Sequence, residues 1–204
     1  MIKLDIFVQI YIMINIILFG KPGSGKGTQA EFIKEKYKLV HISTGDLFRQ
    51  NIKNQTDLGK LAQKYMNNGD LVPDNVTIGM LKLEVESNSN VNGFLFDGFP
   101  RTVDQAISLD NYLEKKKLKI DLTIAIEVED EILIERILNR GLISGRIDDQ
   151  DEIKIKNRFD EYNSKTSFLE EYYKNQNKFK IVDGFGNIKE VTKRLYNEID
   201  ELIK

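Results

Sequence analysis

The sequence predicts an α/β protein whose central sheet has five parallel strands, with helices covering both faces. Five short apolar segments with strand character recur along the chain, and segments with helical spacing separate them. Alternation of this kind is typical of βαβ units, in which the strands run parallel. The predicted strands span residues 14–19, 39–42, 94–96, 122–128 and 179–182.

Length and composition limit the classes of function. A chain of 204 residues suits one domain with small appended segments. Its 30 basic and 32 acidic side chains nearly cancel, so we expect neither nucleic-acid nor membrane binding. The chain has no cysteine and a single histidine, His41, which excludes disulfides, a thiol nucleophile and a zinc site built from cysteines or several histidines. We therefore expect a cytoplasmic protein without zinc.

The first twenty residues are apolar enough to raise the question of a signal peptide or membrane anchor. Polar residues interrupt the run at Asp5, Gln9 and Asn15, and it leads directly into a glycine-rich loop. Both features disfavour a signal or an anchor. Two starting points remain open, Met1 and Met13, and we divide the chain into an N-terminal extension (residues 1–12) and one domain (residues 13–204).

A glycine-rich loop, Gly20 to Thr28, follows the first predicted strand and leads into a helix. Its four glycines are expected to allow positive φ and to let the backbone approach phosphate groups, while the helix N-terminus faces the anion. Lys26 would reach the outer phosphates. This order of strand, loop and helix predicts the three-layer fold of P-loop NTPases; the alternative is a glycine turn without a ligand. The expected ATP-binding residues of the loop are Gly23, Ser24, Gly25, Lys26, Gly27 and Thr28.

The carboxylate of Asp97 is a candidate ligand for the metal ion that accompanies phosphates in such a site. The strand beginning at Phe94 ends at Asp97. A carboxylate at the end of a buried strand beside the phosphates is expected to hold Mg²⁺, directly or through water. The alternative is that Asp97 caps the next turn.

Arginines are the second signal for a phosphate site. Arg136 and Arg140 are four residues apart on a predicted helix, so both guanidinium groups lie on one face. Like charges at this spacing repel unless an anion or acid lies between them, although a solvated helix face remains the alternative. The helix has an apolar stripe of Leu133, Ile134, Ile137 and Leu138. Four further arginines complete a predicted six-arginine site around two nucleotides: Arg49, Arg101, Arg146 and Arg158.

These motifs together resemble those of adenylate kinases. In the generic phosphate loop a serine or threonine follows the lysine, whereas here Gly27 takes that place and Thr28 comes next. The unit from Gly20 to Gln29 is similar to the adenylate kinase loop. Further similar motifs follow in order: Ser43-Thr44-Gly45-Asp46 with Arg49, Leu71-Val72-Pro73-Asp74, Asp97 to Thr102 with Gln105, and Ser144-Gly145-Arg146 with Asp148-Asp149 and Arg158. The resemblance covers the chain from Ile14 to its C-terminus.

The resemblance implies reversible transfer of the terminal phosphoryl group of MgATP to AMP, giving two ADP. It implies contacts with the transferring group from Lys26, Arg101, Arg140, Arg146 and Arg158. On the ATP side it adds Arg136, Arg140 and the backbone at Gly186. For AMP it implies Thr44, Arg49, Asp70, Leu71, Val72, Gly98, Phe99, Pro100, Arg101, Gln105, Arg146 and Arg158. Because this reaction needs no general base, His41 is expected to be a structural histidine with satisfied hydrogen bonds.

The resemblance also implies two small mobile segments. One is the AMP-binding segment, residues 43–72, and the other is a short lid, residues 139–149, in which residues 141–145 link Arg140 to Arg146. The spacing from Arg146 to Arg158 is one residue longer than in the commonest short-lid pattern. One chain supplies every charge that is needed, so we expect a monomer whose partners are ATP, AMP and ADP. The alternatives are a UMP/CMP kinase of the same fold and a nucleotide-binding switch without catalysis.

Overall fold

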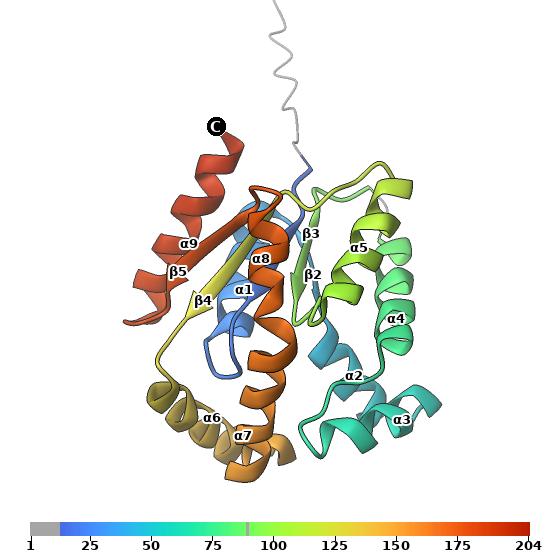
Figure 1. The fold of residues 1–204 in the computed structure, drawn as a ribbon, viewed down its shortest axis with the longest axis vertical. Helices are drawn as coiled ribbons and strands as arrows, with labels where there is room; N and C mark the ends of the chain where they lie inside the picture. The colour runs from blue at the N-terminus through green and yellow to red at the C-terminus, as the bar shows by residue number, and fades with distance from the viewer. Residues whose placement is uncertain (1–12, 89) are drawn as a thin grey trace, which may run out of the picture.

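The computed structural model describes residues 13–88 and 90–204, so the predicted extension, residues 1–12, lies outside the described residues. Its centre is a five-stranded parallel sheet with the strand order β2-β3-β1-β4-β5 (Figure 1). This confirms the predicted fold class. The strands are β1 (Ile16–Phe19), β2 (Val40–Ser43), β3 (Phe94–Asp97), β4 (Leu122–Glu127) and β5 (Phe179–Asp183).

Alternate side chains of β1 point to opposite faces of the sheet, and helices bury both faces. Ile16 and Leu18 belong to an apolar cluster with α1 (Lys26–Tyr37) and α9 (Ile188–Ile203). Ile17 and Phe19 belong to a second cluster on the other face. The helices contributing to the second cluster are α4 (Asp74–Ser87), α5 (Val103–Lys115) and α8 (Phe168–Lys174). Burial on both faces explains why the strands read as continuous apolar runs.

Strand β1 begins two residues later than predicted because Asn15 links neighbouring chain segments through its side chain. Its amide nitrogen donates to the carbonyl oxygen of Lys119 at 2.8 Å, and its amide oxygen accepts from the backbone N–H of Phe94 at 3.1 Å. These two hydrogen bonds connect the residue before β1 to the segment before β4 and to the start of β3. Two other strands extend one residue past the predicted ends, to Ser43 and Asp183, and β3 ends at Asp97, the carboxylate that follows the apolar segment 94–96.

Two smaller helical units project beyond the carboxyl edge of the sheet (Figure 1). Helices α2 (Thr44–Lys53) and α3 (Asp57–Met66) form one unit around their own apolar cluster. Helices α6 (Asp130–Ser144) and α7 (Glu152–Glu161) form the other. A 3₁₀ turn, Ile147–Asp149, follows α6, and a π-helical turn, Tyr162–Thr166, joins α7 to α8.

The α6 region corrects one prediction. Ile134 does not belong to the apolar stripe, because it is 38% exposed while Leu133 and Ile137 are buried. Residues 141–144, which link Arg140 to Arg146, form the last turn of α6, and the helix is capped by Gly145 in the left-handed conformation. Among the described residues, 13–88 and 90–204, no helix is both long and apolar enough to cross a membrane.

Candidate active site

The glycine-rich loop joins β1 to α1 and packs closely against the rest of the site. Gly23 has φ +85°, and a Cβ built there would lie 2.9 Å from the carbonyl oxygen of Leu133 and from Cγ1 of Ile137. A side chain is therefore excluded both by backbone conformation and by contact with α6. The expectation of positive φ is wrong for Gly27, because it lies in the first turn of α1. A Cβ there would instead be 3.8 Å from Oδ2 of Asp97.

Lys26 begins α1 and turns its ammonium group back over the loop. Its Nζ donates to the carbonyl oxygens of Gly20 at 2.6 Å and Lys21 at 3.1 Å. The pKa of Lys26 is lowered to about 8, chiefly by burial; the charge of Asp97 opposes this shift, and the charges of Arg101 and other arginines add to it. Burial of the charged ammonium group of Lys26 costs free energy, and such a cation is typical of a site that binds an anion.

All six predicted arginines line one cavity of about 1100 Å³ together with the glycine-rich loop. The cavity is also lined by Gly186, which follows β5 and has φ +112°. Asp97 contributes a carboxylate from the end of β3. The guanidinium groups and Lys26 come from six separate elements or connections, so the tertiary fold concentrates charges that are scattered along the sequence. The arginines are Arg49, Arg101, Arg136, Arg140, Arg146 and Arg158.

A buried carboxylate that the motifs did not assign a role holds two of these arginines. Asp149, with 0% exposure, accepts from Arg140 Nε at 2.6 Å and Nη2 at 2.8 Å, and from Arg158 Nη1 at 2.6 Å. Burial would raise the pKa of Asp149, but these hydrogen bonds and charges outweigh it and hold the pKa below its usual range. A Cβ on Gly141 would lie 2.7 Å from the Asp149 carbonyl oxygen, so that glycine permits the close approach.

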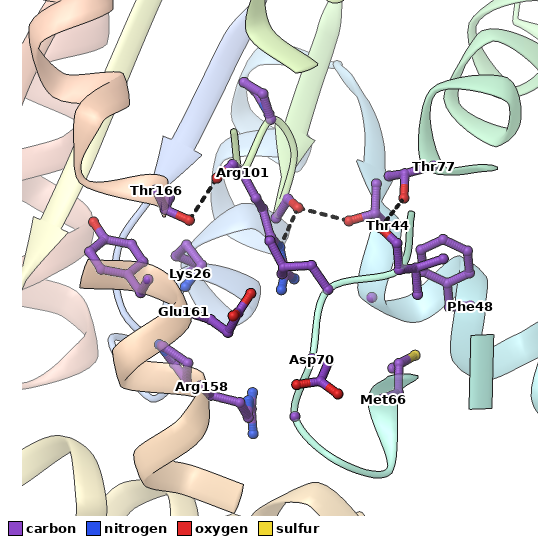
Figure 2. A pocket seen from close by; sticks show the side chains of 18 of the residues that line it. Lys26, Thr44, Phe48, Met66, Asp70, Thr77, Arg101, Arg158, Glu161 and Thr166 are labelled. Atoms are coloured by element: carbon purple, nitrogen blue, oxygen red, sulfur yellow. Dashed lines mark hydrogen bonds between the residues drawn. The ribbon is translucent and has the colours of Figure 1, made fainter. Parts of the chain in front are cut away.

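A second, smaller cavity of about 140 Å³ adjoins the first on the side of α2 and α3 (Figure 2). Arg101 crosses the view of Figure 2 between Lys26 and Arg158 on one side and Thr44 on the other. Its Nε donates to the carbonyl oxygen of Gly98 at 2.7 Å, which also accepts from Thr44 Oγ1 at 2.9 Å. Burial lowers the pKa of Arg101 to about 10. Predicted AMP residues that line this cavity are Thr44, Arg49, Asp70, Leu71, Val72, Gly98, Pro100, Arg101, Gln105 and Arg158.

Phe99 is the one predicted AMP-binding residue that lines neither cavity. Its side chain is 1% exposed and belongs to the apolar cluster on the α5 face of the sheet, and it lines neither cavity. The residues on either side, Gly98 and Pro100, do line the smaller cavity. The side chain of Phe99 therefore serves the core, although both of its neighbours in the motif face the cavity.

Asp97 lies beside His41, a contact that the sequence did not predict. His41 Nε2 is 3.5 Å from Asp97 Oδ2, and its Nδ1 is 3.2 Å from Glu31 Oε1. Burial by itself would lower the pKa of His41, but the two carboxylates raise it above its usual value. The expectation of a histidine with satisfied hydrogen bonds is met only at Nδ1, because the 3.5 Å contact of Nε2 with Asp97 lacks hydrogen-bond geometry and Nε2 has no other partner among the described residues.

One carboxylate of the site, that of Asp97, is placed to hold a divalent cation. Within residues 13–88 and 90–204 no group of three or more His, Cys, Asp or Glu side chains could hold a metal ion. Asp97 is 7% exposed and faces the cavity that contains Lys26 and the loop. Mg²⁺ is usually held by one or two carboxylates together with substrate phosphates and water, so a single carboxylate at this place fits Mg²⁺.

The two helical units touch each other across the site. Asn157 of α7 donates through Nδ2 to the carbonyl oxygen of Asn68 and to Oδ1 of Asp70, both at 2.9 Å. Gly69, between these two residues, has φ +81°, and a Cβ there would be 2.9 Å from the backbone of α7. No pattern in the sequence pointed to Asn157, because its partners lie almost ninety residues away.

Comparison with known proteins agrees with this geometry. The family model for adenylate kinase matches residues 18–178. A protein named adenylate kinase from Flavobacterium psychrophilum is 62% identical over 93% of this chain and 100% of its own length. Proteins of the same name from Flavobacterium johnsoniae and Leptospira biflexa are 59% and 44% identical, over 93% and 92% of this chain and all of their own lengths. The chain therefore belongs to the adenylate kinase family.

Proposed function

We propose that the larger cavity holds MgATP, that the smaller cavity holds AMP, and that the phosphoryl group passes where they meet. The chain is an enzyme of the adenylate kinase family, which transfers the terminal phosphoryl group of ATP to AMP reversibly and forms two ADP. One observation carries the assignment of the two sites: Lys26, Arg49, Arg101 and Arg158 line both cavities. Cations shared by two cavities are suited to a group that moves from one to the other.

The chemistry demands positioning and charge stabilisation rather than proton transfer. The phosphate oxygen of AMP is anionic at neutral pH, so it needs no base before it attacks. Lys26 and the shared arginines hold the donor and acceptor phosphates in line and stabilise the charge that develops on the transferring oxygens. Each arginine contributes on the order of 3 kcal/mol to the transition state. Asp97 would hold Mg²⁺, directly or through water, and the ion would supply positive charge that offsets part of the charge of the phosphates.

Water competes with AMP as a nucleophile, which gives the two projecting helical units their role. Residues 43–72 close over AMP and residues 139–149 close over ATP, so that the phosphates react in a site from which water is excluded. Arg146 Nη2 of the lid lies 3.6 Å from Asp46 Oδ1 of α2, which supports an approach of the two segments. The enzyme acts in the cytoplasm, a reducing compartment that suits a chain without cysteine. It acts as a monomer, because one chain supplies all the groups named above.

A coupled assay of ADP formation with AMP, UMP and CMP as acceptors tests the substrate. We expect turnover with AMP to exceed turnover with either pyrimidine nucleotide, and faster turnover with UMP would contradict the AMP assignment. Lys26→Ala and Arg101→Ala should each reduce kcat by about a thousandfold if both residues stabilise the transferring group. Unchanged ADP formation in both variants would show that the phosphates react elsewhere.

A further inference from the structure

We propose that Asp74 is the positioning residue that gives the enzyme its preference for AMP over 6-oxopurine nucleotides, because it orients the amide of Gln105. Asp74 is not among the residues that line the smaller cavity, whereas Gln105 is. The inference rests on the proposed binding of AMP in that cavity. Asp74 would act on the base only through Gln105.

The hydrogen bonds of Gln105 permit only one orientation of its amide. Gln105 is 2% exposed; its Oε1 accepts from the backbone N–H of Arg101 at 2.8 Å, and its Nε2 donates to Oδ1 of Asp74 at 2.6 Å. The backbone N–H of Arg101 can only donate, and the carboxylate of Asp74 accepts. Exchanging the amide oxygen and nitrogen would set donor against donor and acceptor against acceptor. The two partners therefore determine which way the amide points.

Asp74 is itself held in a closed ring of hydrogen bonds. Its Oδ2 accepts from Thr102 Oγ1 at 2.9 Å, and Thr102 Oγ1 accepts from the backbone N–H of Gln105 at 3.1 Å. Asp74 is the first residue of α4, where the helix dipole favours a negative charge, and Thr102 is the N-cap of α5. The first residues of α4 and α5 thus hold the carboxylate of Asp74 against the side-chain amide of Gln105.

The remaining hydrogen-bonding capacity of Gln105 matches adenine. After its two internal bonds, Nε2 keeps one N–H and Oε1 keeps one lone pair. Adenine offers an amino donor at N6 next to a ring nitrogen acceptor, and a glutamine amide can pair with both. A 6-oxopurine such as that of IMP offers an acceptor at the same place, which would face Oε1. An amide that cannot turn therefore accepts AMP and disfavours IMP, a nucleotide of the same size.

Substitution of Asp74 tests the proposal. For Asp74→Ala we expect the KM for AMP to rise about tenfold and the ratio of kcat/KM for AMP to that for IMP to fall about fivefold or more. The KM for ATP and kcat with saturating AMP should stay within about twofold of the parent enzyme, because the phosphate groups are held by other residues. Asp74→Asn, which keeps an oxygen for Gln105 Nε2, should restore most of the AMP to IMP ratio.

The matched control is Thr102→Val, which removes the helix cap and one bond to Asp74 but leaves the pair of Asp74 with Gln105. We expect it to lower the melting temperature while the AMP to IMP ratio is preserved. If Asp74→Ala does not fold, Asp74→Ser makes the same prediction, because serine suits a helix start but its hydroxyl is too short to reach Gln105.

Two outcomes separate this inference from the proposed function. An unchanged AMP to IMP ratio in Asp74→Ala or Asp74→Ser overturns the role of Asp74, provided that Gln105→Ala raises the KM for AMP. If Gln105→Ala also leaves the KM for AMP unchanged, the placement of AMP in the smaller cavity is wrong and the inference falls with it. A KM for ATP that rises as much as the KM for AMP would also overturn the proposal, because it would indicate general damage to the site.

Discussion

Arg140 of α6 and Arg158 of α7 bind the same carboxylate, that of the fully buried Asp149. Each arginine lies on a different helix of the projecting unit, and both line the cavity proposed for ATP. Two like charges near each other repel, so a shared anion makes their convergence possible before any phosphate arrives. The arrangement prepares the guanidinium groups for the substrate instead of leaving each to find its position on binding.

Replacement of Asp149 by asparagine should therefore affect both stability and catalysis. Asp149→Asn keeps the shape but removes the charge that offsets the two arginines. We expect the free energy of unfolding, measured in urea, to fall by about 2 kcal/mol, less than for a wholly buried pair because Arg140 is partly exposed. We expect kcat to fall by about tenfold or more. Asp148→Asn is the control: Asp148 contacts Arg158 at 3.0 Å, so a smaller effect is expected, and equal effects would contradict the special role of Asp149.

The buried charge of Lys26 should lower the free energy of unfolding of the nucleotide-free enzyme, compared with a variant that has an uncharged side chain at this position. Its pKa of about 8 lies below the ordinary value, so between about pH 8 and pH 10.4 the unfolded chain binds more protons than the native one. The free energy of unfolding then rises with pH across that window. Lys26→Met should stabilise the nucleotide-free protein by about 1 kcal/mol at pH 7 while abolishing activity, and this gain should shrink above pH 8. Thermal melts of both proteins from pH 7 to pH 10 provide the measurement, and a pH-independent difference would refute the assignment.

Contact between Asn157 and the loop at Asp70 should contribute to AMP binding. Asn157→Asp would set a carboxylate against the side chain of Asp70 and the carbonyl oxygen of Asn68, in place of two hydrogen bonds. We expect the KM for AMP to rise by about fivefold to tenfold, with a smaller change in the KM for ATP. Lys156→Gln is the control, since it changes the charge of the same helix by the same amount at an exposed position. If both substitutions raised the KM for AMP equally, the change in charge alone would account for the effect, and the contact with Asp70 would not.

Gly23 should tolerate no side chain. In Gly23→Ala, the positive φ and the contacts with Leu133 and Ile137 act together, and we expect a loss of about 3 kcal/mol in the free energy of unfolding and weaker ATP binding. Gly145→Ala is matched in φ, at +67°, but its side chain would meet open space. It should cost only about 1 kcal/mol. Urea unfolding of the two variants separates the backbone penalty from the steric one, and similar losses would show that contact with α6 is unimportant.

The fold and most of the site could be predicted because their signals are local. The glycine-rich loop, its preceding apolar strand and its following helix are adjacent in the chain, and their order specifies one way of holding phosphate. Only Phe99 of the predicted site residues fails to line either cavity. A motif match assigns all its members to one function, but which face of a turn a side chain occupies depends on the packing around it.

Hydrophobic periodicity and motif spacing are sufficient to predict the layered α/β architecture, the phosphate loop with Lys26 and the arginines of the site, because these signals lie within short segments. Which groups meet follows from the fold: Arg140 and Arg158 contact Asp149, His41 lies beside Asp97, and Gln105 binds Asp74. These contacts join residues from separate elements, and they depend on the strand order β2-β3-β1-β4-β5 and on how the helices pack on it. Periodicity records which face of an element is buried, but not which neighbour buries it.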